Sequence, residues 1–229
     1  MSRDPGERRG SSTRVAWALS LAVTVLVLAL PLLSRALDEP VAVFTRDLFS
    51  TAEIPVYTGF ASNAGVFLWA GCAGVAITGW CLADGATSRG RFLLAGATLT
   101  GIFLVDDFFM VHEWILPRFL GVPEEATLAV YGILVLLWTV AFRGQVRAVG
   151  RGVLFAALVL FGLSEVFDLV EPEAVAAWRT WTEESLKLFG IAAWTLFFLK
   201  AAVQPPSAQA TAASKSESPS GVSSRKVSS

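Results

Sequence analysis

The chain has 229 residues, of which 54% are hydrophobic and 16% are charged, and its formal net charge at pH 7 is −1. A soluble domain has about 45–50% apolar and about 25% charged residues, so this composition is typical of an integral membrane protein. The near-zero net charge gives no electrostatic support for a nucleic-acid partner. Membrane lipids are the partners that we expect.

Six apolar segments are each long enough to cross a hydrocarbon core, which needs about 20 residues. We therefore expect an all-α, polytopic membrane bundle, with transmembrane helices at residues 14–34, 57–83, 92–116, 125–142, 152–170 and 183–203. Residues 1–13 and 204–229 are polar, and we expect them to be disordered tails. Apolar residues at helical spacing predict a short surface helix near residues 41–51.

The distribution of basic residues predicts the orientation of the chain. If the six helices alternate in direction, most of the 18 Lys and Arg residues lie on the side of both tails and of the loops near residues 83–91 and 143–151. The positive-inside rule then predicts a cell-membrane protein with both termini in the cytoplasm. Arg8-Arg9, an apolar run and Ser34-Arg35-Ala36 also fit a cleaved signal peptide, although a run of about 20 residues is longer than usual. An uncleaved first helix is the favoured interpretation.

An internal repeat is also visible in the sequence. A shift of 59 residues places Asp106 on Glu165 and Glu124-Glu125 on Glu183-Glu184. This match predicts a duplicated two-helix hairpin, formed by the third and fourth helices and by the fifth and sixth. Chance matching between apolar segments is the alternative.

The segment Asp106–Glu113 carries four ionisable groups within an apolar run, and it includes the only histidine in the chain. Charge inside a membrane segment is costly and by default marks a functional site. On a straight helix Asp106 and Glu113, seven residues apart, lie on one stripe, with His112 about 100° away. Asp107 is expected to face a neighbouring helix. The segment therefore predicts one wall of a polar pocket.

Two later helices offer the opposing wall. Glu165 and Asp168 are three residues apart and share a face of the fifth helix. On the sixth helix, Lys187 lies one turn from Glu183 and Glu184, and we expect it to be the counter-charge of the pocket. All these groups fall in the outer half of the predicted bilayer, so the pocket is expected to open outward.

Several carboxylates with a single histidine form a hard, oxygen-rich ligand set, which favours Mg, Ca, Mn or Fe. We predict that a divalent metal ion, if one is bound, is held by Asp106, Glu113, Glu165 and Asp168. The predicted catalytic residues are His112, Glu184 and Lys187. The corresponding function is a metal-dependent membrane enzyme acting on a lipid or lipid-linked substrate.

Other interpretations stay open at this point. Thr180–Glu183 fits a capping box at a helix start, and Pro123-Glu124-Glu125 fits another helix start. Lys187 also fits a side chain that extends to the membrane surface. A proton- or cation-coupled transporter or channel is the alternative function. A non-catalytic scaffold with structural ion pairs is the second alternative, so the sequence does not decide whether the protein is an enzyme.

Overall fold

The computed structural model describes residues 5–46, 48–83, 87–169 and 176–204. Every regular element in these ranges is a helix, which confirms the all-helical class. Most of the predicted C-terminal tail lies outside the described residues. The chain divides into two compact units, Met1–Thr58 and Gly59–Ser229, and each is considered by itself.

The described residues of the first unit form three helices. Helix α1, Pro5–Leu37, begins inside the stretch that we expected to be a disordered tail, and α2, Val41–Thr45, and α3, Leu48–Ala52, stand where one surface helix was predicted. The described apolar part of α1 is Val23–Leu37, which is too short to meet the requirement for a membrane span. The predicted crossing at residues 14–34 therefore stays a prediction.

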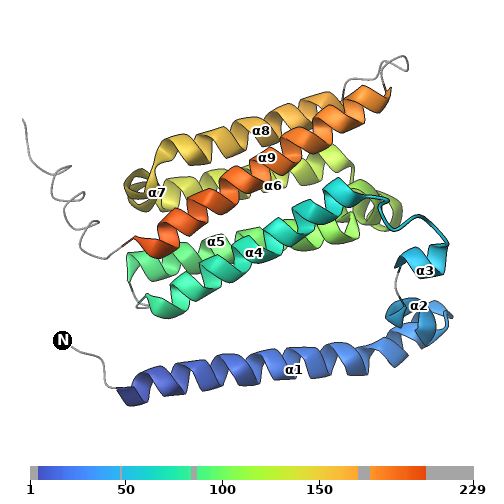
Figure 1. Cartoon of the computed structure of the whole chain (residues 1–229), viewed down its shortest axis with the longest axis horizontal. Coiled ribbons are helices and arrows are strands. Elements are labelled where there is room, and N and C mark those ends of the chain that lie inside the picture. Colours follow the sequence, from blue (N-terminus) through green and yellow to red (C-terminus); the bar gives the residue numbers. More distant parts are fainter. Residues whose placement is uncertain (1–4, 47, 84–86, 170–175, 205–229) are drawn as a thin grey trace, which may run out of the picture. The chain divides into compact units, whose positions relative to one another are not determined.

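The second unit holds the helices that are long and apolar enough to cross a membrane (Figure 1). Its elements are α4 (Phe60–Leu82), α5 (Ser88–Phe109), a π-helix η1 (Val111–Leu120), α6 (Glu124–Ala141), α7 (Arg143–Val149), α8 (Arg151–Leu169) and α9 (Ala176–Val203). Four of them, α4, α5, α6 and α9, qualify as spans, and α7 with α8 forms a fifth that is bent by 101°. Gly150, with φ +126°, lies between α7 and α8, in a conformation that L side chains rarely adopt. Among the described residues there are thus four or five candidate spans instead of six.

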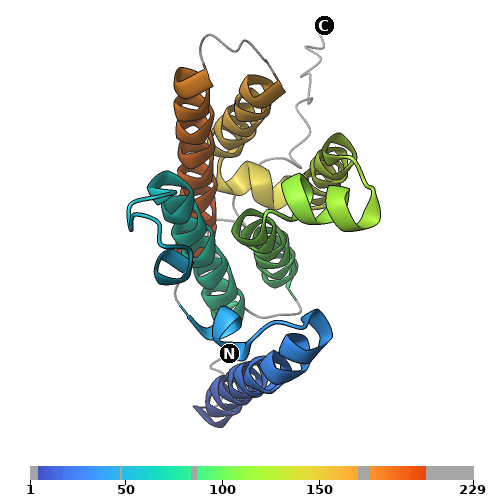
Figure 2. The same ribbon diagram turned by 90° about the vertical axis from the view of Figure 1, so that its right-hand side faces the viewer.

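Contacts within this unit are unevenly distributed. Helix α4 packs along both α5 and α9, and α8 packs along α9, whereas the backbone of α6 comes close to the other helices at few points. Figure 2, which looks along the helices, shows α6 (yellow-green) set apart from α8 (ochre). Glycines allow close approach: a Cβ added to Gly190 of α9 would lie 2.7 Å from the ring of Phe161 of α8, and one added to Gly96 of α5 would lie 2.2 Å from the ring of Phe198 of α9. Helix α6 is therefore held to its neighbours mainly by large side chains, such as Trp138 and Tyr131.

The two predicted hairpins are not alike. Helices α8 and α9 pack along their length, but α5 and α6 make few contacts with each other. The duplication of the hairpin is therefore not confirmed.

The centre of the unit is aromatic. Five of its buried rings form one cluster: Phe92, Trp138, Trp194, Phe197 and Phe198. Trp138 contacts the four others, with ring centroids 5.1–6.1 Å apart. Such pairs add about 0.5–1.5 kcal/mol each beyond the burial of their surface. This cluster fills the half of the bundle that contains the beginning of α5 and the end of α9.

Side-chain hydrogen bonds close that same end. Arg89, at the beginning of α5, donates to the carbonyls of Ala201 and Ala202 at 3.2 and 2.9 Å. The last carbonyls of a helix have no partner within the helix, so Arg89 satisfies those of α9. Gln204 donates to the carbonyl of Ala148 in α7. The acidic residues discussed above belong to the opposite end.

Candidate functional site

The site depends on a break between α5 and η1. Helix α5 ends at Phe109, and Met110 takes left-handed angles (φ +50°, ψ +50°). The amides of Trp114 and Ile115 both donate to the carbonyl of Met110, so the chain continues as a π-helix. A non-glycine residue with positive φ is uncommon, and π-helical segments occur often at functional sites. The prediction of one continuous helix at residues 92–116 is therefore wrong. The placement of Asp106 and Glu113 on one stripe of a straight helix is wrong for the same reason.

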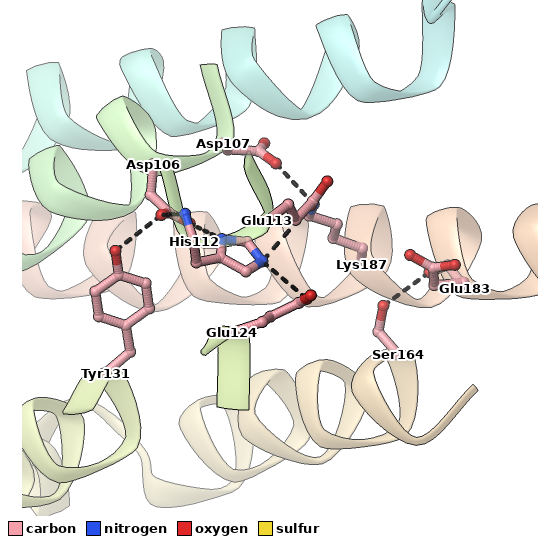
Figure 3. A network of polar contacts seen from close by, with 9 residues as sticks. All are labelled: Asp106, Asp107, His112, Glu113, Glu124, Tyr131, Ser164, Glu183 and Lys187. Carbon is pink, nitrogen blue, oxygen red and sulfur yellow. Dashed lines mark hydrogen bonds and ion pairs between the residues drawn. The ribbon is translucent and has the colours of Figure 1, made fainter. Parts of the chain in front are cut away.

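The break folds His112 back onto Asp106 (Figure 3). The Oδ2 atom of Asp106 lies 2.5 Å from Nδ1 of His112, and Oδ1 accepts the amide of His112 at 3.0 Å. The hydroxyl of Tyr131, from α6, donates to the same Oδ1 at 2.8 Å. Asp106 and His112 are both buried. One buried carboxylate therefore fixes the imidazole, the beginning of η1 and a side chain of α6.

The second ring nitrogen of His112 faces two further acids. Its Nε2 lies 3.5 Å from Oε1 of Glu113 and 3.8 Å from Oε1 of Glu124. Burial opposes the charged form of His112, but the hydrogen bond and charge of Asp106, with the charge of Glu113, outweigh it and raise its pKa. Because Asp106 holds Nδ1, Nε2 is the nitrogen that can exchange a proton.

A second ion pair lies beside the first. Nζ of Lys187, on α9, is 2.7 Å from Oδ1 of Asp107. The Asp107 side chain is only 7% exposed, and among the described residues its other oxygen has no hydrogen-bond partner. Asp107 does face a neighbouring helix, as expected, and it supplies the carboxylate that Lys187 contacts. Sequence reasoning had assigned Lys187 to the pocket as a whole and had given Asp107 no role in it.

Both pairs border one cavity of about 450 Å³. Its walls come from α4, α5, η1, α6, α8 and α9 and consist mainly of apolar residues, with polar groups gathered towards one end. The charged lining residues are Asp106, Asp107, His112, Glu165 and Lys187, and the aromatic ones are Trp69, Phe103, Tyr131, Phe161 and Trp194. The cavity is thus an apolar chamber with a charged end.

The structure brings some of the predicted site residues together. Asp106, His112, Glu165 and Lys187 line the same cavity, and Glu113 is not a lining residue but lies beside His112. Glu184 is partly buried but is not a lining residue, and the side chain of Asp168 lies outside the described residues. Within the described part of the chain, no three His, Cys, Asp or Glu side chains are grouped so as to hold a metal ion. The metal site stays a prediction.

The helix starts were predicted with mixed success. Helix α6 begins at Glu124 after Pro123, which confirms the predicted helix start there. Helix α9 begins at Ala176, so Thr180 lies inside the helix and the predicted capping box is wrong. The carbonyl of Glu183 instead accepts a hydrogen bond from Ser164 of α8 at 3.0 Å.

Sequence reasoning gave no role to two side chains of the candidate site, Tyr131 and Asp107. Tyr131 is the only tyrosine between residues 60 and 229, and it lies seven residues after Glu124, on the same face of α6. That spacing was the available signal for its role. Asp107 was expected only to face a neighbouring helix, because the sequence does not show which helix carries its partner.

Comparisons with known proteins give a family and no activity. Residues 18–201 match the family described as a domain of unknown function, DUF8692. No curated protein and no solved structure matches the chain. The match covers most of the 229 residues. The chain therefore belongs to the DUF8692 family.

Proposed function

We propose that the protein is an integral membrane enzyme that performs acid–base chemistry on a lipid or lipid-linked substrate. The observation that carries this proposal is that an apolar cavity ends at the buried Asp106–His112 pair. A cavity of about 450 Å³ lies within the range of about 300–1,000 Å³ for small-molecule sites. Its position among candidate membrane spans favours a substrate that is itself dissolved in the bilayer.

His112 is the proposed proton carrier. Asp106 accepts the hydrogen of Nδ1, which leaves Nε2 to take a proton from a substrate hydroxyl or from a water molecule. The carboxylate then stabilises the imidazolium that forms. Tyr131 and the amide of His112 hold Asp106 in place, so the base is preorganised before the substrate binds. Tyr131 acts through Asp106 and is a positioning residue.

The cavity also fits the position of a bilayer substrate. Asp106 is three residues before Phe109, the end of the candidate span, and therefore about 5 Å below that end. This level is close to the boundary between the headgroups and the hydrocarbon core, from which the chains of a lipid extend towards the bilayer centre. The charged end of the cavity thus meets the headgroup, and the apolar walls meet the chain. By the charge distribution, we propose that this end faces the outside and that both termini are cytoplasmic.

The test is conversion of defined amphiphiles by purified protein in vesicles. A panel of long-chain esters, amides, alcohols and amines is incubated with wild type and with Asp106→Asn, and products are measured by mass spectrometry. We expect at least one compound to be converted, with a rate about 100-fold or more lower in Asp106→Asn. Glu125→Gln, an exposed acid at the beginning of α6, is the control. Conversion that survives in Asp106→Asn would overturn the proposal, as would no conversion of any compound.

A proton-coupled transporter is the competing function, because Asp106, His112 and Tyr131 form a hydrogen-bonded chain of proton-exchanging groups. The aromatic cluster in the other half of the bundle weighs against a continuous polar path. Flux into vesicles under a pH gradient distinguishes the two functions. A flux that Glu165→Gln abolishes would replace the enzyme proposal.

A metal-dependent form of the enzyme has its own test. Purified wild type is compared with the double variant Asp106→Asn/Glu165→Gln by elemental analysis. Stoichiometric Mg, Ca, Mn or Fe that is lost in the double variant would establish the predicted metal site. Equal and negligible metal in both would leave His112 as the chemical centre of the site.

A further inference from the structure

We infer that the substrate is a long-chain amphiphile with an uncharged or cationic headgroup, which enters sideways from the bilayer between α6 and α8. This inference rests on the proposed function and specifies its substrate class. It concerns binding, so its test requires no turnover. Three observations carry it: the position of the opening, the stiffness of one wall and the charge at the cavity end.

The opening lies between two helices that scarcely contact each other. Helices α6 and α8 both line the cavity, yet they do not pack along one another. Leu136 of α6 lines the cavity and is also 60% exposed, so the chamber is continuous there with the outer surface of the helix. That surface belongs to a candidate membrane span, so it faces lipid. An apolar chain can therefore pass from the bilayer into the cavity without crossing water.

Glycines stand on both sides of this opening. Gly132 of α6 and Gly162 of α8 line the cavity, and a Cβ added to either would have no neighbouring atom within 4 Å. A glycine inside a helix is destabilising relative to alanine. No close contact explains either glycine, in contrast to Gly190, whose added Cβ would lie 2.7 Å from the ring of Phe161. The absent side chains leave space in the opening itself.

Phe161 forms a stiff wall behind the opening. Its ring stacks on Trp69 at 5.8 Å and meets Trp194 edge-on at 6.5 Å. Gly190 allows α9 to approach the same ring closely. A wall of fixed aromatic rings suits an extended hydrocarbon chain, because dispersion contacts form without further loss of side-chain freedom.

The charges at the cavity end select the headgroup. The lining holds three carboxylates, Asp106, Asp107 and Glu165, against Lys187 and His112. Two more acids, Glu113 and Glu124, lie within 3.8 Å of the imidazole. The end is therefore negative even when His112 is charged. A phosphate headgroup would be repelled by the like charge of this end, whereas an amine or hydroxyl can donate hydrogen bonds to the carboxylates.

The test uses three photoreactive probes that share one diazirine-bearing alkyl chain and differ in the headgroup: amine, alcohol or phosphate. Protein in neutral vesicles is irradiated with each probe, and labelled peptides are mapped by mass spectrometry. We expect the amine and the alcohol to label peptides of α6 and α8, and the phosphate to label them at least about tenfold less. Equal labelling by the phosphate would overturn the headgroup assignment.

Variants test the route. Gly162→Leu and Gly132→Leu place a side chain in the opening, and we expect each to reduce labelling about tenfold. Gly152→Leu is the matched control, because Gly152 is also on α8, also lacks neighbours within 4 Å and does not line the cavity. Helix content and melting temperature are compared for all three, and the smaller Gly162→Ala replaces any variant that misfolds. Undiminished labelling in the folded Gly162 and Gly132 variants would overturn lateral entry.

This outcome is separable from that of the proposed function. Labelling of α6 and α8 without any conversion by wild type would support the binding site and overturn the proposed enzymatic function. Conversion that depends on Asp106, with labelling elsewhere, would support the enzyme and overturn the entry route.

Discussion

Replacing Lys187 by methionine tests whether the buried ion pair holds the bundle together. Nζ of Lys187 is 2.7 Å from Asp107, and the two side chains are 23% and 7% exposed. The second oxygen of Asp107 has no described hydrogen-bond partner, so Lys187→Met leaves a buried carboxylate without its cation. Stranding one member of a buried pair costs about 3–5 kcal/mol, whereas an exposed pair contributes about 0–1 kcal/mol.

For a chain of this length each kcal/mol corresponds to about 2–4 °C, so we expect the melting temperature to fall by about 6–20 °C. The assay is thermal unfolding in detergent, followed by circular dichroism. The control is Lys200→Met, which changes an exposed lysine on the same helix. This variant should shift the melting temperature by less than about 2 °C. The double variant Asp107→Leu/Lys187→Met should recover most of the loss, because no charge is then stranded. A loss below about 1 kcal/mol in Lys187→Met would refute this account of the pair.

Two further predictions concern stability. The folded state raises the pKa of His112, so protonated His112 stabilises the fold. This contribution to the free energy of unfolding is complete below the pKa of the unfolded chain, about 6.5, and is lost as the pH rises through the pKa of the folded protein. Thermal unfolding measured across this range should show falling stability with rising pH in wild type, and a flatter profile in Asp106→Asn; equal profiles would contradict the pairing. Gly96→Ala should cost about 1–3 kcal/mol because the methyl group would meet the ring of Phe198, whereas Gly74→Ala, with no atom within 4 Å, should be neutral or slightly stabilising. Denaturant unfolding of both variants checks this contrast, and an equal effect of the two would contradict the packing described for α5 and α9.

The pairing at the site shows where sequence reasoning succeeded and where it failed. The cost of charge in an apolar segment identified Asp106 and His112 without any knowledge of their partners. Regular helical geometry then placed the side chain of His112 well away from that of Asp106, because six residues correspond to a rotation of about 240°. The left-handed angles of Met110 interrupt the regular helix and bring the two side chains together. Met110 has no residue-specific preference for this conformation, so the surrounding packing must impose it.

The partner of Lys187 also shows what sequence reasoning could predict and what depends on helix packing. Its position one turn from two glutamates was visible in the sequence, and so was the need of a buried lysine for a counter-charge. The carboxylate that it contacts is on α5, 80 residues earlier, and the choice between Asp106 and Asp107 depends on how α5 is rotated against α9. That rotation is fixed by close packing around small residues and aromatic rings, such as Gly96 against Phe198.

The sequence by itself determined the helical class, the apolar segments and the residues whose burial requires an explanation. These properties follow from local composition and from the free energy of placing charge in an apolar medium, which act on each segment separately. Only the tertiary structure decided which charges pair, where α5 breaks and where α6 leaves a cavity open beside α8. Those features depend on contacts between segments far apart in the chain, because a packed interior fixes the rotation and spacing of helices jointly.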